Sequence, residues 1–182
     1  GRLPRLTEKE GLTMPDILHS HRLAYRHPDW MAGVWAGLIA GLAFLALEMI
    51  LVPLLMGGSA WEPPRMIAAI VMGPEVLPPP ATFDAGVVTA ALAVHFVLSI
   101  IFGLILAVIV SLFNLDSSAG LIFVVGAVFG LIIYFVNFYG MTAFFPWFAD
   151  ARNWLSMTLH VVFGVVAAES YFGLEKRKPL GA

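Results

Sequence analysis

Residues 86–113 read GVVTAALAVHFVLSIIFGLILAVIVSLF and contain no Asp, Glu, Lys or Arg. As an α-helix rising about 1.5 Å per residue, a run of this length crosses the hydrocarbon core of a bilayer, which is about 30 Å thick. Three more long apolar runs lie at about residues 30–56, 119–141 and 153–173. The sequence therefore predicts an all-α protein in which residues 30–173 form a four-transmembrane-helix bundle, flanked by short segments at 1–29 and 174–182.

The composition excludes several classes of protein. Of the 182 residues, 60% are hydrophobic and 12% are charged, whereas about a quarter of the residues of a soluble domain are charged. The chain has no cysteine, which excludes disulfides, iron–sulfur clusters and thiolate metal sites. The net charge of −2 gives no basic surface for nucleic acid, and no Walker loop, dinucleotide-binding turn or nucleophile elbow is present. We therefore expect a membrane protein that binds no nucleic acid and is not an enzyme.

The basic residues are concentrated at the two ends of the chain. Eight of the ten Lys and Arg residues lie there, and only Arg65 and Arg152 lie between the predicted spans. Basic segments are retained on the cytoplasmic side of a membrane, and four spans place both ends on one side, so both termini are predicted to be cytoplasmic. The basic end residues are Arg2, Arg5, Lys9, Arg22, Arg26, Lys176, Arg177 and Lys178.

The two predicted outer loops are rich in proline and aromatic residues. In the first loop, the apolar stretch 66–72 is too short to span a membrane and is bounded by Pro63-Pro64 and Gly73-Pro74. We expect a short helix there, lying in the outer membrane interface. The second loop, residues 142–152, contains the aromatic run FFPWF. Both loops are expected to pack on lipid or on another protein.

Small residues recur at spacings of four along the predicted spans, and such stripes mark the faces on which membrane helices pack. The second and fourth spans each combine a stripe of this kind with one histidine. The first and third spans share the tetrapeptide AGLI, at 36–39 and 119–122, which hints at two related helical hairpins. The glycines predicted to pack helices are Gly33, Gly37, Gly41, Gly103, Gly126, Gly130 and Gly164.

Three ionisable side chains on three different spans fall in the same outer layer of the predicted bundle: Glu48, His95 and His160. All three lie on the small-residue faces and should point into the bundle, with Asn137 somewhat further out. Ionisable groups are costly inside a membrane and are candidates for function by default. We therefore predict that these three side chains lie close together. Glu169, near the cytoplasmic end, is expected to reach the interface.

Four interpretations of this layer stay open. The side chains could hydrogen-bond neighbouring helices and specify packing, or handle protons or ions. His95 and His160 could ligate a haem b. The two histidines with Glu48 also form a common ligand set for Zn, Fe or Cu. Bound lipid is expected in every case.

Two blocks carry a resemblance to a known group of proteins. They are residues 47–84, with LEMILVPLL, GGSAWEPPRMIAAIVMG and VLPPPATFD, and residues 93–103, AVHFVLSIIFG. The chain resembles small, uncharacterised bacterial four-helix inner-membrane proteins, some of which carry the label sodium:proline symporter. Four spans are too few for the broken-helix ion site of such symporters. The resemblance therefore implies a bacterial inner-membrane location and no particular activity.

These observations lead to one expected function and two alternatives. We expect an accessory, non-catalytic subunit of a larger bacterial inner-membrane complex, of the respiratory oxidoreductase kind. Its partners would be other integral membrane subunits or further copies of the chain. The first alternative is a small oligomeric carrier that handles protons or ions through Glu48, His95 and His160, and the second is a haem b protein.

Overall fold

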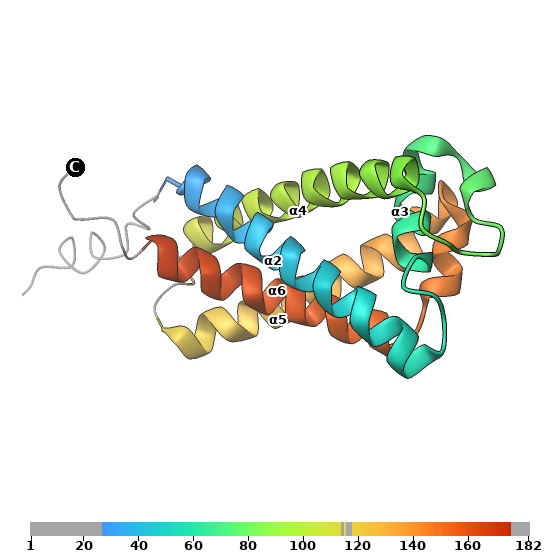
Figure 1. The fold of residues 1–182 in the computed structure, drawn as a ribbon. Coiled ribbons are helices and arrows are strands. Elements are labelled where there is room, and N and C mark those ends of the chain that lie inside the picture. The colour runs from blue at the N-terminus through green and yellow to red at the C-terminus, as the bar shows by residue number, and fades with distance from the viewer. Residues whose placement is uncertain (1–26, 114, 116–117, 176–182) are drawn as a thin grey trace, which may run out of the picture.

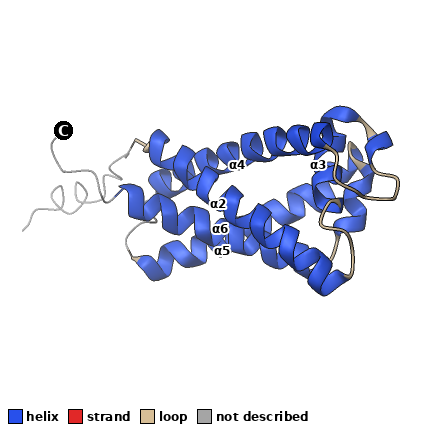
Figure 2. Cartoon of the chain, in the orientation of Figure 1, coloured by secondary structure: helices blue, strands red, loops and turns tan. Residues whose placement is uncertain are grey.

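The computed structural model describes residues 27–113, 115 and 118–175, and every regular element in them is helical (Figure 1, Figure 2). Four stretches are long and apolar enough to cross a membrane: Trp30–Met56, Ala85–Phe113, Ala119–Ala143 and Trp154–Glu175. This confirms the predicted four apolar helices, with boundaries within two residues of those expected. The basic residues of both chain ends, on which the predicted topology depends, lie outside the described residues.

Each long helix begins at a short polar residue. Helices α2 (Trp30–Leu51) and α5 (Ala119–Phe135) are capped by the side chains of Asp29 and Ser118. Asp84 accepts from the amide of Val87 at the start of α4 (Ala85–Phe113), and Asn153 accepts from that of Ser156 at the start of α6 (Trp154–Glu175). Such caps satisfy amide groups that the first helical turn leaves without partners. The four short polar residues therefore fix the residue at which each apolar helix begins.

Two of the long helices widen at their last turn. The first span continues from α2 into a π-helical turn, Val52–Met56, and the third from α5 into another, Val136–Gly140. The first contains Pro53, which has no amide hydrogen to donate to the preceding turn. π-Helical turns of this kind recur at functional sites. The second wide turn carries Asn137, whose partner is described below.

The bundle consists of two closely packed helix pairs, α2 with α4 and α5 with α6, which meet through α2 and α6. Helices α4 and α5 do not pack as a pair in the described part of the chain. In the first pair, a Cβ atom added to Gly103 would overlap the Gly33 carbonyl and lie 2.7 Å from the nitrogen of Gly37. Only glycine allows the two backbones to approach this closely.

The second pair repeats the same contact. A Cβ atom on Gly164 would overlap the Gly126 carbonyl and lie 2.6 Å from the nitrogen of Gly130. Gly33, Gly37 and Gly103 in one pair thus correspond to Gly126, Gly130 and Gly164 in the other. The hint of two related hairpins gains this geometric counterpart, but in a register different from that of the AGLI segments. The register differs because the correspondence is set by the glycines that contact a neighbouring backbone, and not by the AGLI segments.

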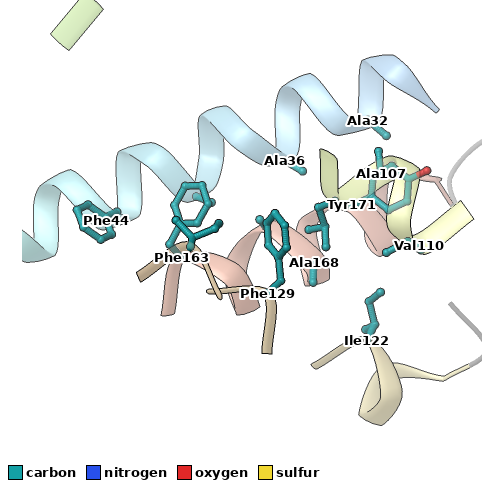
Figure 3. Close-up of a cluster of buried hydrophobic side chains, with 14 of the residues drawn as sticks. Ala32, Ala36, Phe44, Ala107, Val110, Ile122, Phe129, Phe163, Ala168 and Tyr171 are labelled. Carbon is teal, nitrogen blue, oxygen red and sulfur yellow. The ribbon is translucent and has the colours of Figure 1, made fainter. Parts of the chain in front are cut away.

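One hydrophobic core runs along the bundle, and Figure 3 shows a cluster of its buried side chains. Tyr171 is fully buried there, and its hydroxyl accepts from the amide of Asp29 at 3.2 Å and lies 3.2 Å from the hydroxyl of Ser111. One side chain of α6 therefore ties the start of α2 to the end of α4. The core members labelled in Figure 3 are Ala32, Ala36, Phe44, Ala107, Val110, Ile122, Phe129, Phe163, Ala168 and Tyr171.

Helix α3 (Glu62–Met72) lies at the opposite end of the bundle, beside α4 (Figure 1). It starts at Glu62, next to the expected start at Pro63-Pro64, because proline fits the first turn of a helix. It ends at Gly73, as the sequence indicates. Its buried Ala68 packs with Val87 and Ala91 of α4, so this face of α3 lies against the protein.

The aromatic second loop turns largely inward. The indole nitrogen of Trp147 donates to the carbonyl of Met66 in α3 at 3.0 Å, and its ring packs against Phe145 and Phe148. Phe144, which is 73% exposed, points away from the protein. The expectation that this loop packs on lipid or on another protein stays a prediction for Phe144, whereas Phe145, Trp147 and Phe148 pack within the chain.

Candidate functional site

A cavity of about 770 Å³ lies at the α3 end of the bundle. Residues of all four long helices line it, together with α3 and the second loop, because the two helix pairs meet mainly through α2 and α6 while α4 and α5 do not pack as a pair in the described part of the chain. Glu48, His95 and His160 all line this one cavity. A second pocket of about 30 Å³ is also lined by Glu48 and His95. The structure thus brings the three predicted side chains of three different helices around a shared space.

His95 belongs to a stripe on α4 whose six members are all buried: Ala91, His95, Ser99, Gly103, Ala107 and Ser111. Its Nε2 lies 2.9 Å from the carbonyl oxygen of Gly41, and since a carbonyl only accepts, Nε2 carries the hydrogen. A Cβ atom on Gly41 would lie 2.5 Å from the hydroxyl of Ser99 and 3.4 Å from this Nε2. The glycine therefore makes room for the hydrogen bond and supplies its acceptor.

His160 is held on α6 by both of its ring nitrogens. Nδ1 lies 2.7 Å from the carbonyl oxygen of Ser156 and must donate to it. Nε2 then accepts from the side-chain amide nitrogen (Nδ2) of Asn137, at 3.3 Å. Asn137 lies in the wide turn after α5. This arrangement fits a neutral imidazole. A second hydrogen on Nε2 requires the Asn137 amide to turn and present its oxygen.

Phe44 of α2 makes ring contacts with both histidines. Its ring centroid lies 5.9 Å from that of His95 and 5.0 Å from that of His160. Among the described residues, the two imidazoles and Glu48 make no hydrogen bond to one another. The predicted layer is therefore grouped around a common space without direct polar contacts between its members.

Glu48 lies one helical turn beyond Phe44 on α2 and is the unsatisfied member of the layer. Its Oε2 atom is buried and has no hydrogen-bond partner within the described part of the chain. A buried carboxyl oxygen without a partner is rare in native proteins, and an intramembrane carboxylate needs a partner or a proton. The Oε2 atom of Glu48 is therefore the atom lining this cavity that most needs a binding partner.

The side-chain geometry can be compared with the haem and metal alternatives. A haem iron bound by His95 and His160 needs one unshared nitrogen from each ring. Both nitrogens of His160, and Nε2 of His95, already bond to protein groups. Within residues 27–113, 115 and 118–175, no three His, Asp or Glu side chains are grouped as metal ligands. The haem and metal alternatives stay predictions.

The predicted packing glycines all lie in the two helix pairs, away from the cavity except where Gly41 accepts from His95. Glu169 does not line the cavity. Sequence reasoning did not single out Phe44, Glu62 or Asp150, which all line it. Phe44 could have been found in the sequence from its position one helical turn before Glu48. The other two lie at the α3 end of the cavity, and their position depends on how the loops fold.

Comparisons with protein-family models, with curated proteins and with solved structures find no match for this chain. The resemblance to bacterial four-helix inner-membrane proteins stays a prediction.

Proposed function

We propose that this chain is a multi-pass protein of the bacterial inner membrane, with both termini in the cytoplasm and α3 in the outer interface. The bias of basic residues toward the chain ends supports this topology. Val71 and Met72, in the last turn of α3, are 63% and 39% exposed and suit contact with lipid. Lipid bound along the exposed apolar faces belongs to the same proposal. In this topology the cavity lies in the outer half of the bilayer.

Within that frame, the protein acts as a small carrier that handles protons or ions through Glu48, His95 and His160. The observation that carries this proposal is the buried, unpartnered Oε2 of Glu48 beside a cavity of about 770 Å³. A purely structural polar group would have its hydrogen bonds satisfied by the protein. The two histidines, whose bonds are satisfied, shape the cavity around Glu48.

The chemistry follows from the cost of charge in a membrane. An isolated carboxylate near the middle of a membrane helix costs about 2.5 kcal/mol or more, so Glu48 is either neutral or matched by a cation. These two states exchange a proton for a cation at one carboxyl group. Glu62 at the start of α3 and Asp150 in the second loop line the same cavity nearer the α3 end, which gives cations an acidic approach.

Reconstitution tests the carrier function. The full chain is inserted into liposomes that contain a pH-sensitive dye, and a gradient of potassium ions is imposed without an ionophore, because exchange of one proton for one cation moves no net charge. Proton movement above that of empty liposomes is expected for the parent and not for Glu48→Gln, whose side chain has the same shape and cannot ionise. Glu169→Gln makes the same change on a membrane helix outside the cavity and should behave like the parent. Proton movement unaffected by Glu48→Gln would refute the proposal.

The accessory-subunit function is kept as a second candidate because of one observation. Large apolar side chains near the α3 end are exposed, among them Phe144 at 73%, Leu54 at 71% and Phe83 at 61%. Exposed aromatic groups at this level suit contact with another membrane subunit. Native mass measurement in a mild detergent, with the subunits identified, decides between the accessory-subunit and carrier functions. A defined hetero-complex supports the second candidate, and the chain alone or with copies of itself supports the carrier.

A further inference from the structure

The charges that line the cavity have one sign. Three carboxyl groups contribute, Glu48, Glu62 and Asp150, while no Lys or Arg of the described residues is among the lining side chains. An anionic ligand would therefore meet carboxyl groups and no basic partner. The charge of the cavity selects for cations and against anions.

The two arginines near this end of the bundle are held elsewhere. Arg65 donates to the carbonyl of Val76 at 2.7 Å and to that of Thr82 at 2.9 Å. Arg152 donates to the hydroxyl of Thr142 at 3.1 Å, and its guanidinium carbon lies 4.5 Å from the ring centroid of Tyr139. Both side chains thus bind loop groups instead of neutralising the carboxyl groups of the cavity.

The remaining walls are mostly apolar and aromatic, and their polar members are His95, Ser99, Asn137, Asn153, Ser156 and His160. Six phenylalanine rings line the cavity: Phe44, Phe102, Phe138, Phe145, Phe148 and Phe163. The face of an aromatic ring attracts a cation, and more strongly where water is excluded. A volume of about 770 Å³ falls in the range of cavities that hold drug-sized molecules, roughly 300–1,000 Å³. A bare metal ion would leave most of this space and all of these rings unused.

From these observations we infer that the cavity binds a lipophilic organic cation, a hydrophobic amine or quaternary onium, with its charge beside Glu48 and its apolar groups among the phenylalanine rings. This inference rests on the proposed carrier function and specifies what exchanges with the proton. A zwitterionic phospholipid head group fits less well, because its phosphate would lie among carboxyl groups with no Lys or Arg to receive it.

A matched pair of probes tests the sign of the charge. Tetraphenylphosphonium and tetraphenylborate have nearly the same size and shape and opposite charge. Binding of each to the detergent-purified full chain is measured by isothermal titration calorimetry. We expect the cation to bind at least about tenfold more tightly than the anion, which corresponds to about 1.4 kcal/mol. Equal binding of the two ions, tighter binding of the anion, or binding of neither ion overturns the inference.

Variants then locate the binding site. Glu48→Gln should weaken binding of tetraphenylphosphonium at least about tenfold, while Glu48→Asp should restore part of it and Glu169→Gln should leave it unchanged. Cation binding that is insensitive to Glu48→Gln in a variant with the parent's helical circular dichroism overturns the assignment to this cavity. The probe comparison on the parent chain still decides the inference if a variant does not fold.

The two proposals fail in different ways. If protons move through Glu48 in liposomes but tetraphenylphosphonium and tetraphenylborate bind equally, the carrier function stands and the organic-cation inference falls. If the cation binds through Glu48 but no protons move, the ligand class stands and the carrier function falls.

Discussion

Nε2 of His160 lies 3.3 Å from the amide nitrogen of Asn137, and this contact joins α6 to the wide turn after α5. Because Nδ1 of His160 already donates to the carbonyl of Ser156, Nε2 has to be the acceptor. The ring therefore has one donor and one acceptor satisfied within the protein. This contact is a side-chain hydrogen bond between two helices in the wall of the cavity.

Replacing Asn137 by alanine removes the only partner that the described residues give to Nε2 of His160. We expect Asn137→Ala to lower the free energy of unfolding by about 0.6–1.7 kcal/mol, between the average and the largest value measured for hydrogen bonds between membrane helices. The measurement is equilibrium unfolding of the purified chain in mixed micelles. Thr158→Val serves as control, because its hydroxyl donates to the carbonyl of Trp154 on an exposed face of α6. Equal losses in the free energy of unfolding for the two variants would show that the contact between Asn137 and His160 contributes no more to stability than an exposed hydroxyl does.

The equivalent contacts of the two helix pairs predict equivalent effects of mutation. A methyl group on Gly37 would overlap the carbonyl of Ser99, and one on Gly130 would overlap the carbonyl of His160. Gly37→Ala and Gly130→Ala are each expected to destabilise the bundle by about 1–3 kcal/mol, since the backbones must separate. Thermal unfolding in detergent measures both.

Gly120 provides the control for these glycines, because no atom lies within 4 Å of an added Cβ atom there. Gly120→Ala should leave stability unchanged or raise it by about 0.5–1 kcal/mol, as alanine is the better helix former. Gly37→Leu, with the mild exposed change Leu42→Ile for comparison, enlarges the same effect. A Gly37→Leu protein that melts like the parent would show that α2 and α4 do not meet at this residue.

Tyr171 should couple energetically to Ser111. Their hydroxyls lie 3.2 Å apart, and Tyr171 also accepts from the amide of Asp29. In a double-mutant cycle of Tyr171→Phe and Ser111→Ala, we expect a coupling energy of about 0.6–1.7 kcal/mol. Both changes keep the volume of the core nearly constant, so the coupling reports the hydrogen bond. Strictly additive effects would indicate that the two hydroxyls do not interact.

The proposed topology is tested by reporter fusions. A fusion at the C-terminus should be active with a cytoplasmic reporter, because the chain ends carry eight of the ten basic residues. A reporter inserted between residues 73 and 80, just after α3, should be active only on the periplasmic side. The opposite pattern at either position would reverse the orientation and place the cavity in the inner half of the bilayer.

The sequence predicts the part of this fold that depends on the membrane itself. Long apolar runs with few charged residues have to become helices in lipid, so the four spans follow from composition and length. The stripe through His95, Ser99 and Gly103 predicts a buried face because spacing by four residues keeps side chains on one side of a helix. All six members of that stripe are buried.

The lateral order of the helices and the cavity could not be predicted in the same way. Nothing in the spans indicates that α2 packs on both α4 and α6 while α4 and α5 stay apart, because glycine stripes mark contact faces without naming the partner. The lining by Glu62 and Asp150 depends on how α3 and the second loop fold over the end of the bundle, which is decided by contacts such as that of Trp147 with Met66. The role of Phe44 between the histidines follows from the same helix order.

The central claim is that Glu48 is a proton-exchanging carboxyl group in a cavity that cations reach. Dicyclohexylcarbodiimide modifies carboxyl groups that are protonated in an apolar environment, and mass spectrometry identifies the modified residue. In membranes containing the full chain, the account predicts modification of Glu48 and its suppression by tetraphenylphosphonium, with no such suppression at Glu169. Modification of Glu169 without Glu48, or modification of Glu48 that tetraphenylphosphonium does not reduce, would contradict it.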